Sequence, residues 1–226
     1  MGLFDSLKRN VEQSAKSAVN RGIRQGVNNA VNGAVNQAVN GAVNNAVNSA
    51  VNNARNAAGN TVREISFHTL PASLAEMQAL PEAALTDPFA VAALTVVALN
   101  EYTINKDVAL QMLDFLNGPN DVSQSDIQFL RDRVMDGHTY VARSYFKGAT
   151  PDNNYTPTIP YTVTVMQNAY SQRAENYLTL WLYSGGADSP REVQLRLKPS
   201  TGQWFANMWN GLLSGIRMPK ADDPWA

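Results

Sequence analysis

The two histidines, His68 and His138, are the side chains of this sequence whose ordinary pKa lies nearest neutrality, so they are the first candidates for acid–base chemistry. His138 follows Gly137 and comes two residues after Asp136, a spacing at which the carboxylate could orient the imidazole as a general base. Helices, however, commonly end in a glycine. The pattern therefore favours a helix end over a catalytic site, and His68 falls in a predicted strand.

Acidic pairs, glycine pairs and cysteines offer no stronger chemical signal. Asp132 and Asp136 are four residues apart, the spacing of neighbours on a helix surface. Gly185 and Gly186 suit a hairpin turn better than a phosphate cradle. The chain lacks a P-loop, a dinucleotide fingerprint, a nucleophile elbow and a metalloprotease helix, and it contains no cysteine. We expect a protein that is not an enzyme and has no cofactor, metal site or identified small-molecule substrate. The alternative is a ligand-binding or enzymatic domain whose site the sequence does not reveal.

Charge is distributed unevenly along the chain. Residues 1–63 contain seven basic and two acidic side chains, a net of +5, whereas the whole chain has a net charge of −1. A basic arm suggests an anionic surface or an acidic partner. The acidic remainder, and the lack of a dense basic run or an aromatic RNA-binding motif, argue against nucleic acid.

A four-residue repeat occupies residues 20–60, as in "AVNGAVNQAVNGAVNNAVN". On an α-helix each four-residue step moves the valine stripe by about 40°, so the stripe travels around the helix. Ten asparagines lie among the thirty uncharged residues 25–54, which argues against a span through a bilayer. Asn, Val and Gly also form isolated helices poorly, so the segment needs partners to become ordered.

Residues four apart form the ridges through which crossing helices interlock, and small residues let the backbones approach closely. We therefore predict that the repeat self-assembles into a homo-oligomer or filament. The predicted assembly residues are Val27, Ala30, Val31, Ala34, Val35, Ala38, Val39, Ala42, Val43, Ala46 and Val47. The alternatives are a flexible tether, lipid contact and stacked β-strands.

Residues 1–19 have an amphipathic helical pattern, with an apolar tip and a basic opposite face. Such a helix can dock on a neighbouring subunit or lie in a membrane surface. The residues proposed for this contact are Leu3, Phe4, Leu7, Lys8 and Arg9. No secretory signal is visible, so we expect a cytoplasmic protein, with peripheral membrane attachment as the alternative.

Residues 64–226 are predicted to form one α+β domain. After a candidate strand at 63–70, helices are expected at 73–80, 87–102, 105–118 and from Ser123 or Ser125 to Gly137. The helix at 87–102 has Asp87 as its cap and Pro88 in its first turn, and its apolar run is too short to span a bilayer. It is therefore predicted to be a buried core helix.

Beyond residue 137 the apolar period changes to two. Four strands are predicted at 139–146, 160–167, 176–183 and 191–198, forming an antiparallel sheet with one buried face. Tyr177, Trp181 and Tyr183 would lie on the less buried face, as a binding groove or as part of a core packed on both sides. Residues 200–216 return to helical spacing, so a C-terminal helix is expected to cover the four-stranded sheet.

The C-terminal stretch "KPSTGQWF...IRMP...DPWA" resembles the tail of uncharacterised bacterial proteins, mainly of Firmicutes. This resemblance covers about thirty residues and implies a bacterial α+β domain of unknown function, without catalytic residues to transfer. The full expectation is a long N-terminal repeat helix, a helical segment, and a four-stranded sheet covered by a C-terminal helix.

Overall fold

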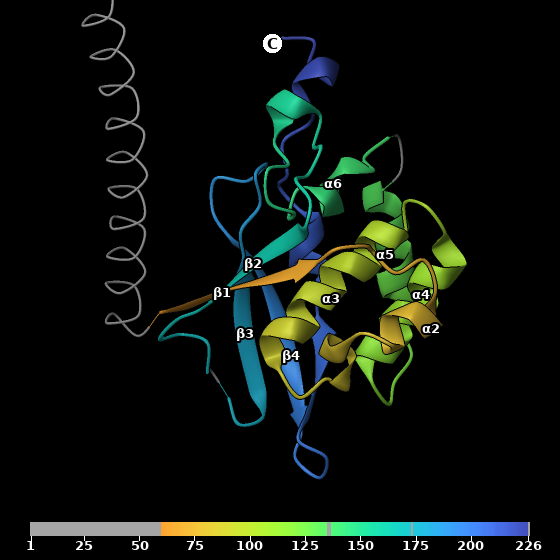
Figure 1. Cartoon of the computed structure of the whole chain (residues 1–226), viewed down its shortest axis with the longest axis vertical. Coiled ribbons are helices and arrows are strands. Elements are labelled where there is room, and N and C mark those ends of the chain that lie inside the picture. The colour runs from red at the N-terminus through yellow and green to blue at the C-terminus, as the bar shows by residue number, and fades with distance from the viewer. Residues whose placement is uncertain (1–59, 135–136, 173, 226) are drawn as a thin grey trace, which may run out of the picture. The chain divides into compact units, whose positions relative to one another are not determined.

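The computed structural model describes residues 60–134, 137–172 and 174–225. The amphipathic segment 1–19 and every predicted assembly residue of the repeat lie outside these residues. The described part has helices and an antiparallel sheet, which confirms the α+β class (Figure 1).

The sheet has five strands in the order β1-β2-β3-β4-β5, and each pairs antiparallel with its neighbour. The strands are β1 (Thr61–Phe67), β2 (Tyr161–Gln167), β3 (Tyr177–Leu182), β4 (Arg191–Lys198) and β5 (Gln203–Met208). Strand β1 is separated in sequence from β2 by all the described α-helices, so the helical layer is an insertion between the first two strands.

Alternating side chains give the sheet one buried face. In β4, Val193 and Leu195 are fully buried while Glu192 and Arg196 are exposed. Across the register, Leu195 lies opposite Leu178 of β3. The predicted strands at 160–167, 176–183 and 191–198 are therefore confirmed.

Helix α3 (Pro88–Glu101) is the centre of the core, and every residue from Phe89 to Glu101 is buried. The Asp87 carboxylate accepts a hydrogen bond from the Phe89 backbone N–H at 3.0 Å, which confirms the predicted cap. The helix packs against α4 and all five strands. Because both its sides are covered, its sequence is apolar all round, as predicted for a buried helix.

The other helices form a layer around α3 (Figure 1). They are α2 (Leu74–Gln78), α4 (Lys106–Asn117), α5 (Gln124–Val134) and α6 (Tyr140–Arg143), with 3-10 turns η1 (Pro81–Ala84), η2 (Pro151–Asn153), η3 (Asn210–Leu213) and η4 (Lys220–Asp222). Asn105 caps α4 through the Val108 N–H. The Ser123 hydroxyl accepts from the Asp126 N–H, so Ser123 rather than Ser125 caps α5.

Two predicted elements are wrong. Residues 139–146 form helix α6 and a single bridge from Phe146 to Val163, not a strand. The Ser144 N–H donates to the Tyr140 carbonyl at 3.0 Å, a hydrogen bond of helical i to i−4 spacing.

The predicted C-terminal helix is strand β5 followed by η3. Strand β1, which confirms the candidate strand at 63–70, and β5 are the two strands beyond the three confirmed ones, so the sheet has five strands rather than four. Lys198 O accepts hydrogen bonds from the N–H groups of Thr201 and Gly202, closing a tight turn. Gly202 has φ +70°, which returns the chain beside β4. The buried helix that packs on this sheet is α3, which precedes β2 to β5 in the sequence instead of following them.

Candidate functional site

The predicted chemical residues are not brought together in the described structure. His138 is exposed, with its ring centroid 5.7 Å from that of Tyr140. Its predicted partner Asp136 lies outside the described residues. Asp132 is exposed on α5 and accepts a hydrogen bond from Gln128, while His68 is exposed just after β1. No group of three or more His, Asp or Glu side chains is placed to hold a metal ion in the described ranges.

The aromatic residues Tyr177, Trp181 and Tyr183 are half-buried on the sheet face opposite α3. The Tyr183 hydroxyl donates to the Met166 sulfur at 3.4 Å, and the Arg196 guanidinium lies 5.6 Å from the Tyr177 ring centroid. These contacts lie along the sheet surface, as expected for side chains on its less buried face.

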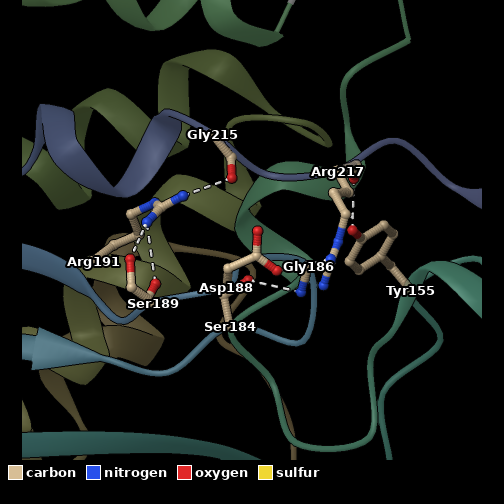
Figure 2. A network of polar contacts seen from close by, with 8 residues as sticks. All are labelled: Tyr155, Ser184, Gly186, Asp188, Ser189, Arg191, Gly215 and Arg217. Carbon is tan, nitrogen blue, oxygen red and sulfur yellow. Dashed lines mark hydrogen bonds and ion pairs between the residues drawn. The ribbon is translucent and has the colours of Figure 1, made fainter.

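A polar network surrounds Gly186 in the β3–β4 connection (Figure 2), where Gly185 is the preceding residue. A Cβ atom on Gly185 would fall on the Ala149 carbonyl oxygen, and one on Gly186 would fall on the Tyr155 hydroxyl. The pair is therefore packed too closely against protein to cradle a phosphate, in agreement with the predicted turn. The Tyr155 hydroxyl donates to the Arg217 carbonyl at 2.6 Å. Burial, assisted by Tyr140, raises the pKa of Tyr155 to about 12, so it remains a donor.

Two arginines of this network are satisfied by protein groups (Figure 2). The Arg191 guanidinium donates to the Ser214 and Gly215 carbonyls at 2.8 and 2.7 Å, and to Ser189 at 3.0 and 3.1 Å. Arg217 pairs with Asp188 at 2.8 Å. The network joins the β3–β4 connection to the C-terminal segment. The two guanidinium groups of the network already have protein partners, so the network holds these two segments together and is not a candidate binding site.

A cavity of about 450 Å³ lies at the C-terminal end of α3, and we name it the α3–α6 cavity. Three lining side chains follow one face of the end of α3, two come from α6 and its start, and the others from the loops and strand beside them. The lining residues are Leu70, Asn100, Thr103, Ile104, Thr139, Arg143, Phe146, Pro157 and Tyr161. Its volume lies within the range of small-molecule sites.

Two side chains that line this cavity each have a buried polar atom without a partner in the described part of the chain: Asn100 Oδ1 and Arg143 Nε. Asn100 is only 5% exposed. Buried polar atoms are nearly always hydrogen-bonded, because an unpaired one costs about 1–3 kcal/mol. Asn100 and Arg143 therefore each keep one buried polar atom unsatisfied beside the cavity.

The rest of the wall is largely apolar. Phe146 is buried and meets the Tyr161 ring edge to face, with centroids 5.6 Å apart. Ile104 is 74% exposed. A largely apolar wall with a few convergent polar groups is the usual composition of a ligand site.

A larger cavity of about 740 Å³ lies beside the C-terminal segment, but of its charged side chains Asp152, Arg217 and Lys220 are in ion pairs and Asp223 accepts the Trp225 N–H. Lys220 lies 3.5 Å from Asp152, and Arg217 is bound to Asp188. A third, of about 270 Å³, is lined by Arg196 and Lys198, both exposed to solvent. By volume alone the cavity of about 740 Å³ would be the better candidate. We choose the α3–α6 cavity because two of its lining residues have unsatisfied buried atoms.

Glu101, next to Asn100, is a buried carboxyl that predicts a pH effect on stability. It is 5% exposed, and its pKa is raised above the ordinary 4.5 mainly by burial and further by Glu76. The folded state thus holds this proton to higher pH than the unfolded chain, so its contribution to stability is complete at low pH and is lost as pH rises through the raised pKa. Glu101→Gln should therefore melt at a higher temperature than the wild type at pH 7–8, and the difference should disappear toward pH 4. Melting curves from pH 4 to 8 test this, and a difference that stays constant with pH would contradict it.

Sequence reasoning missed the cavity. In the sequence, Asn100 is a polar residue that closes an apolar run, and that run predicts only the helix that contains it. Arg143 falls in the predicted strand at 139–146, and a strand there would point its side chain in a different direction from helix α6. The signal in the sequence is a basic residue, Arg143, inside the stretch YVARSYF.

A protein-family model described as "Domain of unknown function (DUF6935)" matches residues 69–220. The match confirms the resemblance to an uncharacterised domain family. The D-P-W-A ending lies beyond the matched residues, and a source in Firmicutes stays a prediction. No curated protein and no solved structure matches the chain. Within the described residues, none of the helices has the length and apolar content that crossing a bilayer requires.

Proposed function

The chain belongs to the family described as Domain of unknown function (DUF6935), and from its own geometry we propose that the domain binds a small organic molecule in the α3–α6 cavity. One observation carries this proposal: Asn100 and Arg143, which each keep a buried polar atom without a partner, line the same cavity. Such atoms are met by ordered water or by a ligand. The cavity is larger than one water molecule requires, and its apolar wall favours an organic occupant.

The contrast with the network of Figure 2 supports this reading. There, the Arg191 guanidinium makes four hydrogen bonds to protein acceptors. At Arg143, the hydrogen bond to Thr139 is long, at 3.4 Å. The same fold thus satisfies one half-buried arginine closely and leaves another facing a cavity.

Ligand-observed NMR of the full chain against a fragment library tests the proposal. Some fragments should give saturation-transfer signals that weaken at least tenfold in Asn100→Leu and in Arg143→Gln. Arg196→Gln, which changes an exposed arginine outside this cavity, is the matched control and should bind as the wild type does. The proposal fails if no fragment binds, or if both cavity variants bind as well as the control.

A site that keeps an unpaired polar atom lowers the stability of the empty protein, which gives a second prediction. Asn100→Leu replaces the buried amide by an apolar side chain of similar size, so the free energy of unfolding should rise by roughly 1 kcal/mol. The melting midpoint should then rise by about 2–4 °C. Asn117→Leu is the control: the Asn117 amide donates to the Asn120 carbonyl at 3.0 Å, so its loss should bring no gain. A lower midpoint for Asn100→Leu than for the wild type would contradict the argument.

A second candidate function is self-assembly into a homo-oligomer or filament through the repeat at residues 20–60, with the α+β domain displayed on it. What supports it is the neutral four-residue pattern, with a small residue before each valine. A cytoplasmic location, with a membrane surface as the alternative site of residues 1–19, is part of this proposal.

Mass measurement in solution separates assembly from the alternatives. The full chain should form large or defined assemblies, and a chain lacking residues 20–56 should be monomeric. Ala34, Ala38 and Ala42 replaced together by leucine should reduce the assembly mass while the domain melts unchanged, because the larger side chains hold the helices apart. Equal masses for the full and shortened chains would defeat the proposal.

A further inference from the structure

Strand β1 lies at one edge of the sheet, and β2 is the strand that it pairs with among the described residues (Figure 1). The Tyr183 N–H donates to the Thr164 carbonyl at 3.1 Å, so the even-numbered residues of β2 direct their backbone groups toward β3. These directions alternate in an antiparallel ladder, so the odd-numbered residues of β2 bond to the odd-numbered residues of β1. The backbone groups of Val62, Glu64 and Ser66 therefore point to the open side of the sheet.

The fold closes the other edge of the sheet and leaves this one open. At β5, the Trp204 N–H donates to the Leu85 carbonyl at 2.7 Å, so the residue after η1 occupies that edge. The β4–β5 pairing also contains a register shift, whereas β1 and β2 pair in an unbroken register. Among the described residues, no other backbone group bonds to the outward N–H and C=O groups of β1. Such a regular edge is a template for a further strand.

A second copy of β1 fits this edge in a centred antiparallel register. With Glu64 opposite the Glu64 of the second copy, Val62 lies opposite Ser66, and every outward residue has an outward residue as its counterpart. Each opposed pair exchanges two hydrogen bonds, about six in all. The two-fold axis of this arrangement passes through Glu64, so the same strand supplies both halves of the contact.

The charged side chains of β1 are compatible with this pairing. The Glu64 carboxylate accepts from the Lys147 ammonium at 2.9 and 3.2 Å, so each carboxylate at the axis has its own counter-charge. Arg63 pairs with Asp87 of the same copy at 2.7 Å. Like charges placed directly opposite each other destabilise a strand pair. Here two carboxylates meet together with two ammonium groups, which removes the net charge at the axis.

The chain before β1 favours a second copy as the occupant of the edge. The predicted assembly residues end at Val47, and thirteen residues, 48–60, separate them from Thr61 at the start of β1. Such a connection spans at most about 45 Å. Copies joined through the repeat therefore keep their β1 strands at an effective concentration on the order of millimolar. A single edge contact buries too little surface to hold two separate domains together, so it forms only within the assembly.

We propose that the β1 strands of two copies pair antiparallel about Glu64, joining two sheets into one as a second contact within the assembly. This inference rests on the proposed self-assembly through residues 20–60. The repeat gathers the copies, and the pairing of the β1 strands fixes the orientation of the α+β domains two by two.

Disulfide cross-linking of the full chain tests the contact, because the chain has no cysteine and each variant adds a single thiol. Opposed residues of a hydrogen-bonded pair have Cα atoms about 5.5 Å apart, within the range that a disulfide bridges. In oxidised glutathione, Glu64→Cys should form covalent dimers at least tenfold faster than Thr201→Cys. Thr201 is the matched control, since it is exposed and lies in the β4–β5 turn, away from this edge.

Two further variants test the register. Val62→Cys and Ser66→Cys should each cross-link no faster than Thr201→Cys, because each thiol lies more than about 13 Å from its own counterpart. Co-expression of the two variants places their thiols opposite each other, and cross-linking should then rise at least tenfold above the control. Equal rates for all four variants would indicate random collision and would overturn the proposal.

The outcomes separate this contact from the assembly on which it rests. If the full chain is large by mass while Glu64→Cys cross-links no faster than the control, the β1 pairing is wrong and self-assembly through the repeat stands. If the full chain and the chain lacking residues 20–56 have equal masses, self-assembly fails and the inference fails with it. In the shortened chain the cross-linking of Glu64→Cys should drop at least tenfold, and an unchanged rate would overturn the dependence on the repeat.

Discussion

Gly185→Ala is expected to lower the free energy of unfolding by roughly 3 kcal/mol or more. The added methyl group would overlap the carbonyl oxygen of Ala149, which belongs to the backbone and cannot turn aside as a side chain can. The Gly185 N–H also donates to the Ser144 carbonyl at 2.8 Å, so the loop cannot retreat without breaking that hydrogen bond. Urea denaturation followed by circular dichroism measures the loss.

Gly202→Ala is the matched control for this substitution. Gly202 has φ +70°, but nothing lies within 4 Å of the position that its Cβ would take. Alanine there should cost only the backbone strain of a left-handed conformation, about 1 kcal/mol. If the two variants lost the same stability, close packing at Gly185 would not be the cause.

The network around Gly186 explains why the described domain extends so far toward the C-terminus (Figure 2). The Gly186 carbonyl accepts from the Arg217 N–H at 2.9 Å, while Arg191 holds the carbonyls of Ser214 and Gly215. Residues after β5 are therefore bound to the β3–β4 connection, although they carry little regular structure. The I-R-x-P part of the tail, residues 216–219, takes part in these contacts through Arg217 and lies within the family match to residue 220.

The elements that the sequence predicts well are those whose burial is periodic. In β2, β3 and β4 the buried apolar side chains stand at every second residue because they lie on one face of the sheet. Helix α3 is almost entirely apolar because it is covered on both sides. Caps add precision: Asp87 and Asn105 use their side-chain oxygens on backbone N–H groups, a local interaction that neighbouring residues reveal.

The elements that fail are those decided by tertiary contacts. In β5, Phe205 packs against Gly118 from the end of α4, which holds it at the sheet edge. The apolar spacing of its sequence fits a helix equally well, so periodicity could not choose. In α6, four residues are too few for a helical period to be recognised.

The α3–α6 cavity fails for another reason. Its two polar groups, Asn100 and Arg143, are 43 positions apart in the sequence, and nothing in either local pattern relates them. What makes them a candidate site is that each keeps one buried atom without a partner, and this depends on the packing of every neighbour. A sequence pattern reports which groups are present, whereas satisfaction of hydrogen bonds is a property of the assembled fold.

Leu94→Ala is expected to cost about 3 kcal/mol, because Leu94 is fully buried in the middle of α3. Removing three carbon atoms there loses their transfer from water and leaves a cavity that α3, packed between the sheet and α4, cannot close. The domain should still fold, with a clearly lower urea midpoint and an unchanged slope, since the surface exposed on unfolding is nearly the same.

Leu110→Ala in α4 makes the same chemical change at a half-buried position of the core edge. Solvent and neighbouring side chains can fill part of the space there, so the loss should be clearly smaller than at Leu94. The difference between the two variants measures how far the stability of this domain depends on α3 as its central element. Equal losses would mean that the stability is spread evenly over the helical layer, and α3 could then not be the rigid support that positions Asn100 in the cavity.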